Sequence, residues 1–444
     1  MRRFIISLIA ASALGLASWY FLYSAPETNQ VAVVLRKLAK APPNLPDQPD
    51  EWRGRIDYGK LDQQFAALTR RSEMAGLAVA IVEDGELRFV HSYGVVDRST
   101  DVPVTNNTVF RWASVSKTVA GTLAASMASE GAVDLNKPVS SWHSSLRLPD
   151  GAESRISFAQ LLAQQTGLTK NAYDEKLEDG QDPRVIRASL AEAPLQCTPG
   201  TCHTYQNLAF DAASEILAKA GKRSYPHLVS ERFFLPLGMT SANFGMAGLT
   251  GAKDWARPHS GSSVRTLKES YWRVPAAAGV ESNIVDFSRW LQATMGERPD
   301  VLPASTLRLA QAPRVNTAPI YGGELRQANS DTHYGLGWRS FTYDGHRLEG
   351  HSGAVSGYRA TMIFEPATRT GVVALWNSDW GFPFRIPFAA IDSYHGRTDA
   401  QWLDLSELPP ARRSGAGSGT ARKPLATLRQ PRTASIKACC STGV

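Results

Sequence analysis

The sequence predicts an α+β fold in which one antiparallel sheet is assembled from N- and C-terminal segments, flanked by helices, with a large helical lobe inserted between them. Strand patterns occur between residues 77 and 93 and again between 346 and 377, whereas residues 134–332 show helices and long polar loops. The 444 residues, 43% of them hydrophobic, suffice for a large core. We therefore predict one composite domain over residues 58–400.

The N-terminal part of this domain is predicted to contain a helix and a hairpin. Residues 58–74 have the pattern of a helix. The strands that follow, 77–82 and 86–93, are separated by Asp84-Gly85, a sequence typical of a tight hairpin turn. This hairpin supplies the N-terminal strands of the sheet.

The lobe and the C-terminal part follow the same reasoning. Ser157 and Gln160 form a capping box at the start of one helix, and a second helix, 208–220, is stopped by Gly221. Three strands are expected near the C-terminus, at 346–350, 358–365 and 371–377. A helix at 384–394 is expected to close the sheet.

The N-terminal end is expected to direct the protein out of the cytoplasm. Three residues, Met1-Arg2-Arg3, precede the mostly apolar run 4–23, a pattern typical of an export signal or a membrane anchor. We assign residues 1–30 to this segment and 31–57 to a Pro-rich linker. The expected location is periplasmic or otherwise extracytoplasmic, on the inner membrane if the segment is not cleaved.

The net charge of +7 comes from the other end of the chain. Residues 411–444 contain seven basic and no acidic residues, so the remainder is balanced. Because this region is also rich in Gly, Ser, Thr, Ala and Pro, residues 401–444 are predicted to form a disordered basic tail. The charge therefore indicates no nucleic-acid partner.

The four cysteines fall into two pairs. Cys197 and Cys202 flank a Pro-Gly turn, where a small-loop disulfide fits an oxidising compartment; two free thiols are the alternative. The disulfide would stiffen the segment that leads to Tyr205. Cys439 and Cys440 are adjacent in the tail, and the sequence assigns them no role.

Candidate catalytic residues occur in three short motifs. These motifs are Ser114-Val115-Ser116-Lys117, Tyr205-Gln206-Asn207 and His351-Ser352-Gly353. An apolar run from Val115 to Gly131 predicts that Ser114 opens a helix, near unsatisfied N–H groups, with Lys117 on the same face one turn later. A serine hydroxyl needs a base to act as a nucleophile at neutral pH. Either a partly neutral Lys117 or a Tyr205 phenolate stabilised by a cation could serve.

Together the motifs resemble the class C β-lactamase and penicillin-recognising serine hydrolase superfamily, which includes DD-peptidases, D-aminopeptidases and related esterases. The resemblance extends from about Leu61 to Tyr394 and implies a β-lactamase-like fold. Its supporting stretches are Leu161-Leu162-Ala163-Gln164-Gln165-Thr166-Gly167-Leu168, Ala278-Gly279-Val280-Glu281-Ser282-Asn283 and Tyr334-Gly335-Leu336-Gly337-Trp338.

The resemblance also implies residue roles. Ser114 would be the nucleophile, Tyr205 the general base and Lys117 its coupled proton partner, whereas Asn207 would hold Lys117 and the substrate amide. The backbone N–H groups of Ser114 and Ala354 would form the oxyanion hole, consistent with the general need for aimed donors.

The third motif would lie on the strand that borders the cleft. The missing side chain of Gly353 would let the substrate backbone approach beside Ser352. His351 departs from the Lys-Thr-Gly usual in class C β-lactamases and matches the His-x-Gly of several DD-peptidases and aminopeptidases. An imidazole is only partly charged near neutrality, so it would hold a substrate carboxylate less strongly than an ammonium. This argues against an efficient cephalosporinase.

No metal or cofactor is expected, because the nine histidines show neither His-Glu-x-x-His nor Cys/His zinc spacing. We predict an exported serine hydrolase that acts through an acyl-enzyme on an amide or ester of a β-lactam, D-amino-acid peptide or similar small substrate, with peptidoglycan as a candidate partner. The alternatives are a short-chain carboxylesterase and a non-catalytic, membrane-anchored binding relative. The sequence leaves the oligomeric state open.

Overall fold

The computed structural model describes residues 45–46, 48–397 and 401–406. The expected signal or anchor segment, most of the linker, nearly all of the basic tail and the Cys439-Cys440 pair lie outside these residues. None of the helices in the described ranges combines the length and apolar character needed to cross a bilayer.

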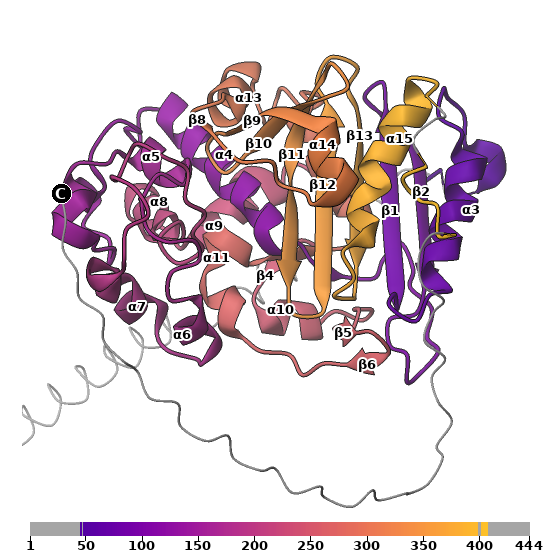
Figure 1. The fold of residues 1–444 in the computed structure, drawn as a ribbon, viewed down its shortest axis with the longest axis horizontal. Coiled ribbons are helices and arrows are strands. Elements are labelled where there is room, and N and C mark those ends of the chain that lie inside the picture. The colour runs from indigo at the N-terminus through magenta and orange to yellow at the C-terminus, as the bar shows by residue number, and fades with distance from the viewer. Residues whose placement is uncertain (1–44, 47, 398–400, 407–444) are drawn as a thin grey trace, which may run out of the picture. The chain divides into compact units, whose positions relative to one another are not determined.

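The centre of the fold is an eight-stranded antiparallel sheet with the order β2-β1-β13-β12-β11-β10-β9-β8 (Figure 1). The N-terminal hairpin joins the C-terminal meander through β1 and β13, where Leu77 pairs with Trp376. The predicted α+β class, with a sheet built from both ends of the chain, is confirmed. The strands are β1 (Gly76–Glu83), β2 (Glu86–Gly94), β8 (Val315–Asn316), β9 (Asn329–Tyr334), β10 (Arg339–Tyr343), β11 (His346–Val355), β12 (Tyr358–Glu365) and β13 (Thr370–Trp376).

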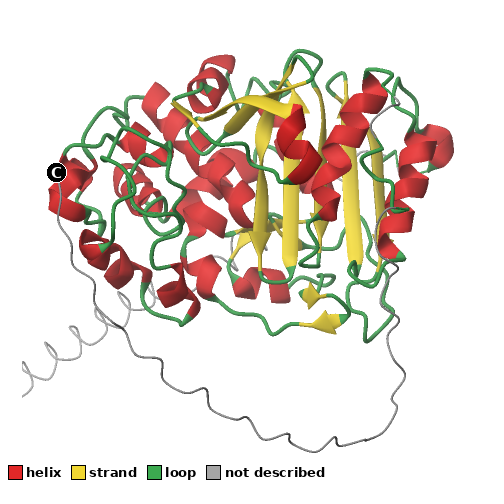
Figure 2. Ribbon diagram, viewed as in Figure 1, coloured by secondary structure: helices red, strands yellow, loops and turns green. Residues whose placement is uncertain are grey.

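Helices cover both faces of the sheet, as Figure 2 shows. Strand β1 is buried along its whole length. Its Leu77, Val79 and Ile81 pack in one core with α3 (Tyr58–Thr69) and α15 (Ile386–Tyr394). Ala78 and Ala80 face the other core, which contains α4 (Ser116–Ser129) and α12 (Ile284–Thr294). Because successive side chains point to opposite faces, a strand buried on both sides is apolar at every position.

The lobe between β2 and β9, which the short strand β8 interrupts, consists mainly of short helices. The capping box predicted at Ser157 and Gln160 is present. Two small sheets, β3-β7-β4 and β5-β6, complete the region. Its elements are β3 (Phe110–Arg111), α5 (Phe158–Leu162), α6 (Asp174–Glu178), α7 (Pro183–Ser189), α8 (Ala212–Gly221), α9 (Tyr225–Val229), β4 (Asn243–Phe244), α10 (Met246–Thr250), β5 (His259–Ser260), β6 (Ser263–Val264), α11 (Pro275–Ala278), β7 (Val280–Ser282), α13 (Ala304–Gln311) and α14 (Gly323–Ala328).

Three helix boundaries differ from the sequence prediction. Helix α3 ends at Thr69 rather than residue 74, and the Arg98 guanidinium binds the carbonyls of Arg71 and Met74 in the turn that follows. Helix α8 begins four residues late, at Ala212. Helix α15 begins after a 3-10 turn at 382–385. The strands β8 to β10 were not predicted, because they are short and two of them surround the glycine-rich 335–337 turn.

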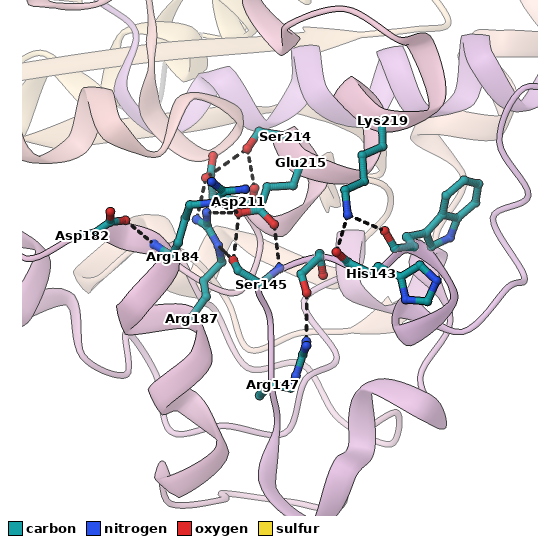
Figure 3. Close-up of polar contacts among 12 residues, drawn as sticks. His143, Ser145, Arg147, Asp182, Arg184, Arg187, Asp211, Ser214, Glu215 and Lys219 are labelled. Atoms are coloured by element: carbon teal, nitrogen blue, oxygen red, sulfur yellow. Dashed lines mark hydrogen bonds and ion pairs between the residues drawn. The ribbon is translucent and has the colours of Figure 1, made fainter.

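A buried ionic cluster holds the lobe together (Figure 3). Arg187 of α7 contacts Asp211 Oδ2 at 2.9 Å and Glu215 Oε1 at 2.6 Å, and the arginine side chain is only 4% exposed. The other Asp211 oxygen accepts from the backbone N–H of Ala276 at 2.8 Å. Burial raises the pKa of Asp211 to about 7, although Arg187 favours the ionised form. The cluster therefore ties α7 and α8 to α11.

Candidate active site

The predicted nucleophile lies at a constrained turn between β3 and α4. Ser114 occupies a 3-10 turn, Ala113–Val115, that precedes α4. Ala113 has φ 48°, a left-handed conformation that costs about 1–3 kcal/mol for a non-glycine residue. Strand β7 holds the turn in place: Trp112 N donates to Val280 O at 2.9 Å, and Val280 N donates to Ser116 Oγ at 3.0 Å. The hydroxyl of Ser114 is thus presented by a fixed backbone.

Lys117 lies one turn later and is fully buried. Its Nζ is 3.4 Å from Ser114 Oγ, 2.8 Å from Asn207 Oδ1 and 3.0 Å from Ala277 O. An ammonium would donate to all three oxygens. A neutral amine would donate to Asn207 and Ala277 and accept the Ser114 proton. The three contacts fit both protonation states, so both bases considered from the sequence stay open.

Tyr205 reaches the same point from a loop before α8. Its ring centroid lies 4.8 Å from Lys117 Nζ. The loop is paired to the lobe through Gln164, whose side chain accepts from Gln206 N at 2.8 Å and donates to Gln206 O at 3.0 Å. The structure therefore brings together the serine, the lysine and the tyrosine from separate parts of the sequence.

Asn207 connects Lys117 to a carboxylate that the sequence did not reveal. Its Nδ2 donates to Asp174 Oδ2 at 2.7 Å, and Tyr271 OH donates to the same oxygen at 3.2 Å. The Asn207 amide therefore accepts from Lys117 and donates one N–H to Asp174, and because an amide nitrogen has two N–H groups, the expected contact with a substrate amide stays a prediction. Burial raises the pKa of Asp174 to about 6, whereas the Asn207 hydrogen bond and the Lys117 charge oppose the rise.

The third motif lies on β11, beside the serine turn. A Cβ atom on Gly353 would come within 2.8 Å of Ser114 N and would also overlap Trp112 O. The missing side chain therefore lets the strand approach the nucleophile's own backbone. The substrate approach that the sequence suggested stays a prediction. The neighbouring Ala354 is exposed. This placement puts the Ser114 and Gly353–Ala354 backbones side by side.

The structure changes the expected charge of His351, which the sequence analysis treated as a partly charged imidazole. Only 1% of the residue is exposed, and both ring nitrogens have partners: Nε2 lies 3.0 Å from Tyr334 OH and Nδ1 lies 2.7 Å from Ser352 O. Burial and the nearby Arg339 charge hold the pKa of His351 well below its usual value. A neutral ring that donates from Nδ1 and accepts at Nε2 satisfies both contacts. It provides no cation for a substrate carboxylate.

A cation is available instead at Arg339 of β10, which lines the same cavity as Lys170 and Arg385. Its guanidinium carbon lies 5.5 Å from the Tyr205 ring centroid and 5.0 Å from that of Tyr334. Among the described residues no carboxylate forms an ion pair with it. The sequence analysis overlooked Arg339, although it directly follows the Tyr334–Trp338 stretch that supported the resemblance.

Most of these groups, though not the buried Lys117 and Tyr334, line one cavity of about 900 Å³, within the range usual for small-molecule sites. Ser114, Tyr205, Asn207 and the 351–354 stretch line it together with Asp174 and Arg339. Ser352 Oγ lies 3.2 Å from Tyr321 OH and 3.1 Å from Thr361 Oγ1. Further aromatic side chains on the wall are Tyr271, Trp380, Phe382 and Phe384.

A disulfide joins Cys197 and Cys202, the pair that the sequence favoured. His203, which follows it, packs its ring 5.2 Å from that of Tyr334. Burial lowers the pKa of His203 to about 3, with the Arg339 charge acting in the same direction. The bridge therefore closes the small loop immediately before Tyr205.

Comparison with known proteins identifies the class. Residues 61–393 match the Beta-lactamase family, so the chain belongs to this family, whose members are usually serine hydrolases. The expected superfamily is thereby confirmed. A structural neighbour is the octameric penicillin-binding protein homologue from Pyrococcus abyssi, with a TM-score of 0.68 and 21% identity over 77% of this chain and 78% of that one. At this identity the likeness shows the fold.

Two curated relatives match at similar identity. Protein flp of Staphylococcus aureus is 24% identical over 315 residues, which is 69% of this chain and 60% of the relative. The chain thus spans about 60% of the length of that relative. A Beta-lactamase of Yersinia enterocolitica is 24% identical over 368 residues, covering 74% of this chain and 89% of the relative.

Proposed function

We propose that this protein is an exported serine hydrolase that forms an acyl-enzyme on Ser114 with a small amide or ester substrate, such as a β-lactam or a D-amino-acid peptide. One observation carries the proposal. Lys117 Nζ is held 3.4 Å from Ser114 Oγ and 4.8 Å from the Tyr205 ring centroid, and Ser114 and Tyr205 line a cavity large enough for such a substrate.

The reaction follows two covalent steps. Ser114 Oγ attacks the substrate carbonyl carbon while its proton passes to the Lys117/Tyr205 pair, and the same pair returns a proton to the leaving group. Water then attacks the ester carbonyl and releases the acid. The backbone N–H groups of Ser114 and Ala354, on the adjoining turn and strand, are the proposed donors to the developing oxyanion.

Arg339 supports a substrate that carries a carboxylate. A guanidinium that faces a cavity without a carboxylate partner among the described residues can bind an anion in bidentate fashion. β-Lactams and peptides with a free C-terminus have such a group, whereas simple esters do not. This favours the β-lactam and peptide classes over the short-chain carboxylesterase alternative.

Two features support an extracytoplasmic location. A disulfide between Cys197 and Cys202 suits an oxidising compartment. The basic and then apolar beginning of the chain suits export, with or without retention as a membrane anchor. In that compartment peptidoglycan fragments are the proposed natural substrates.

A time course with a labelled penicillin tests the function. We expect covalent labelling that is lost in Ser114→Ala and kept in Ser129→Ala, an exposed serine at the other end of α4. Rapid turnover of the label would indicate a β-lactamase, and persistent label a peptidase. Hydrolysis of short-chain esters without labelling would indicate the esterase. If Ser114→Ala changed none of these reactions, the non-catalytic binding relative would replace the proposal.

A further inference from the structure

A second cluster of functional side chains lies at the far end of β11 from the catalytic cavity. His346 begins β11, Glu365 ends β12, and His395 directly follows α15. His346 Nδ1 is 2.7 Å from Glu365 Oε1, and His395 Nε2 is 2.7 Å from Glu365 Oε2. The possible ligand atoms of the three residues all lie within 4.8 Å of one another.

The arrangement aims two imidazole nitrogens at opposite oxygens of one buried carboxylate. The two imidazole centroids are only 3.9 Å apart. Two imidazolium ions at this separation would repel, whereas neutral rings present lone pairs or N–H groups without that cost. A divalent cation can replace the two bridging protons and bind the nitrogens and a carboxylate oxygen directly.

We propose that His346, Glu365 and His395 bind a divalent transition-metal cation of the zinc class. Two imidazole nitrogens and one carboxylate are a usual three-residue ligand set for Zn²⁺, with the fourth position taken by water. Imidazole donors disfavour Mg²⁺ and Ca²⁺, which prefer oxygen ligands. The set comes from positions so far apart in sequence that no local zinc spacing could reveal it.

Small side-chain movements would complete the coordination. Tetrahedral Zn²⁺ with ligand bonds of about 2.0–2.1 Å separates neighbouring donors by about 3.3 Å. The possible ligand atoms lie within 4.8 Å of one another, so their separations need to change by at most about 1.5 Å. The histidine side chains can do this because they are 32% and 18% exposed, whereas that of Glu365 is 4% exposed. Thr368 Oγ1 donates to Glu365 Oε2 at 3.1 Å and orients the carboxylate.

The cation would join the end of α15 to the sheet. Glu365 and His346 belong to adjacent strands, whereas His395 caps the helix. Gly353, which touches the serine turn, lies seven residues further along β11 than His346, or about 24 Å away in an extended strand. The proposed role is therefore structural, separate from the acyl-enzyme chemistry.

Zinc titration of the tag-free full-length chain tests this site. Cys439 and Cys440 are replaced by Ser in every sample, because adjacent thiols also bind zinc. After chelator treatment we expect one Zn²⁺ per chain by calorimetry, a higher melting temperature with Zn²⁺, and a four-coordinate visible spectrum with Co²⁺. No saturable binding in this protein would overturn the site.

Ligand variants locate the bound ion. His395→Gln should weaken zinc affinity at least about 100-fold. Removing a group that only orients a metal ligand costs about 10- to 100-fold, and removing a ligand itself should cost at least as much as the upper value. His227→Gln is the matched control, since this ring contacts a single carboxylate, Glu231, at 3.5 Å. Penicillin labelling of Ser114 should persist in both variants and reports that they are folded. Equal zinc affinity in the two variants would refute the assignment.

Discussion

Replacement of Asp174 by Asn should make the protein more stable at neutral pH and less active. The carboxyl is 8% exposed, and burial raises its pKa from 3.8 to about 6. Between these values the folded protein binds a proton that the unfolded chain does not. The free energy of unfolding of the wild type therefore falls as pH rises from about 4 to 6.

The size of this effect follows from the two pKa values. Each pH unit between them corresponds to about 1.4 kcal/mol, so holding the ionised carboxylate in the fold costs about 3 kcal/mol at pH 7. Asn keeps the shape but never ionises. The difference in unfolding free energy between Asp174→Asn and wild type should therefore grow by about 2 kcal/mol from pH 4 to pH 7, in favour of the variant.

Urea denaturation across this pH range measures the difference. Asp182→Asn, at the exposed cap of α7, controls for loss of one negative charge on the same lobe. Acylation should meanwhile fall about 10- to 100-fold, because a hydrogen bond to a charged group, worth about 1.5–3 kcal/mol, no longer orients Asn207. A pH-independent stability difference, or unchanged acylation, would refute the reasoning.

Three further predictions concern packing and charge. Gly353→Ala should reduce penicillin labelling about 100-fold with the fold retained by circular dichroism, because its Cβ displaces the Ser114 turn; near-normal labelling would contradict this close approach. Arg187→Met should lower the unfolding free energy, measured in urea, by about 3–5 kcal/mol. The Arg184 side chain is 72% exposed, so Arg184→Met should lower it by less than about 1 kcal/mol, and equal losses would count against the buried cluster. Arg339→Met should raise KM about 10- to 100-fold for substrates with a free carboxylate and leave their methyl esters unchanged; an equal effect on both would exclude carboxylate binding.

Much of the fold could be predicted because its signals are local. The hairpin at Asp84-Gly85 and the capping box at Ser157 depend on residues a few positions apart. Strand β1 is apolar on both faces, as its buried position in the sheet requires. That both ends share one sheet was inferred from strand patterns at the two ends and helices between them, whereas the pairing of β1 with β13 was shown only by the structure.

The candidate site likewise contains residues that the sequence could predict and residues that it could not. Ser114 and Lys117 are one helical turn apart, so their proximity was predictable from spacing alone. Tyr205 could be proposed as a base from its chemistry, whereas the general-base role of Tyr205 and the substrate-binding role of His351 came from the resemblance. Asp174 was missed because its significance depends on a contact with Asn207, which lies 33 positions away in the sequence. No sequence pattern predicts that contact.

The sequence by itself predicted serine-hydrolase chemistry and determined the order in which its motifs occur. Only the tertiary structure decided which groups are charged, because desolvation depends on everything packed around a side chain. It makes His351 neutral, places Arg339 on the cavity wall together with Lys170 and Arg385, and gathers His346, Glu365 and His395 at one end of the sheet. Those outcomes come from contacts between distant segments, and such contacts leave no periodic or local trace along the chain.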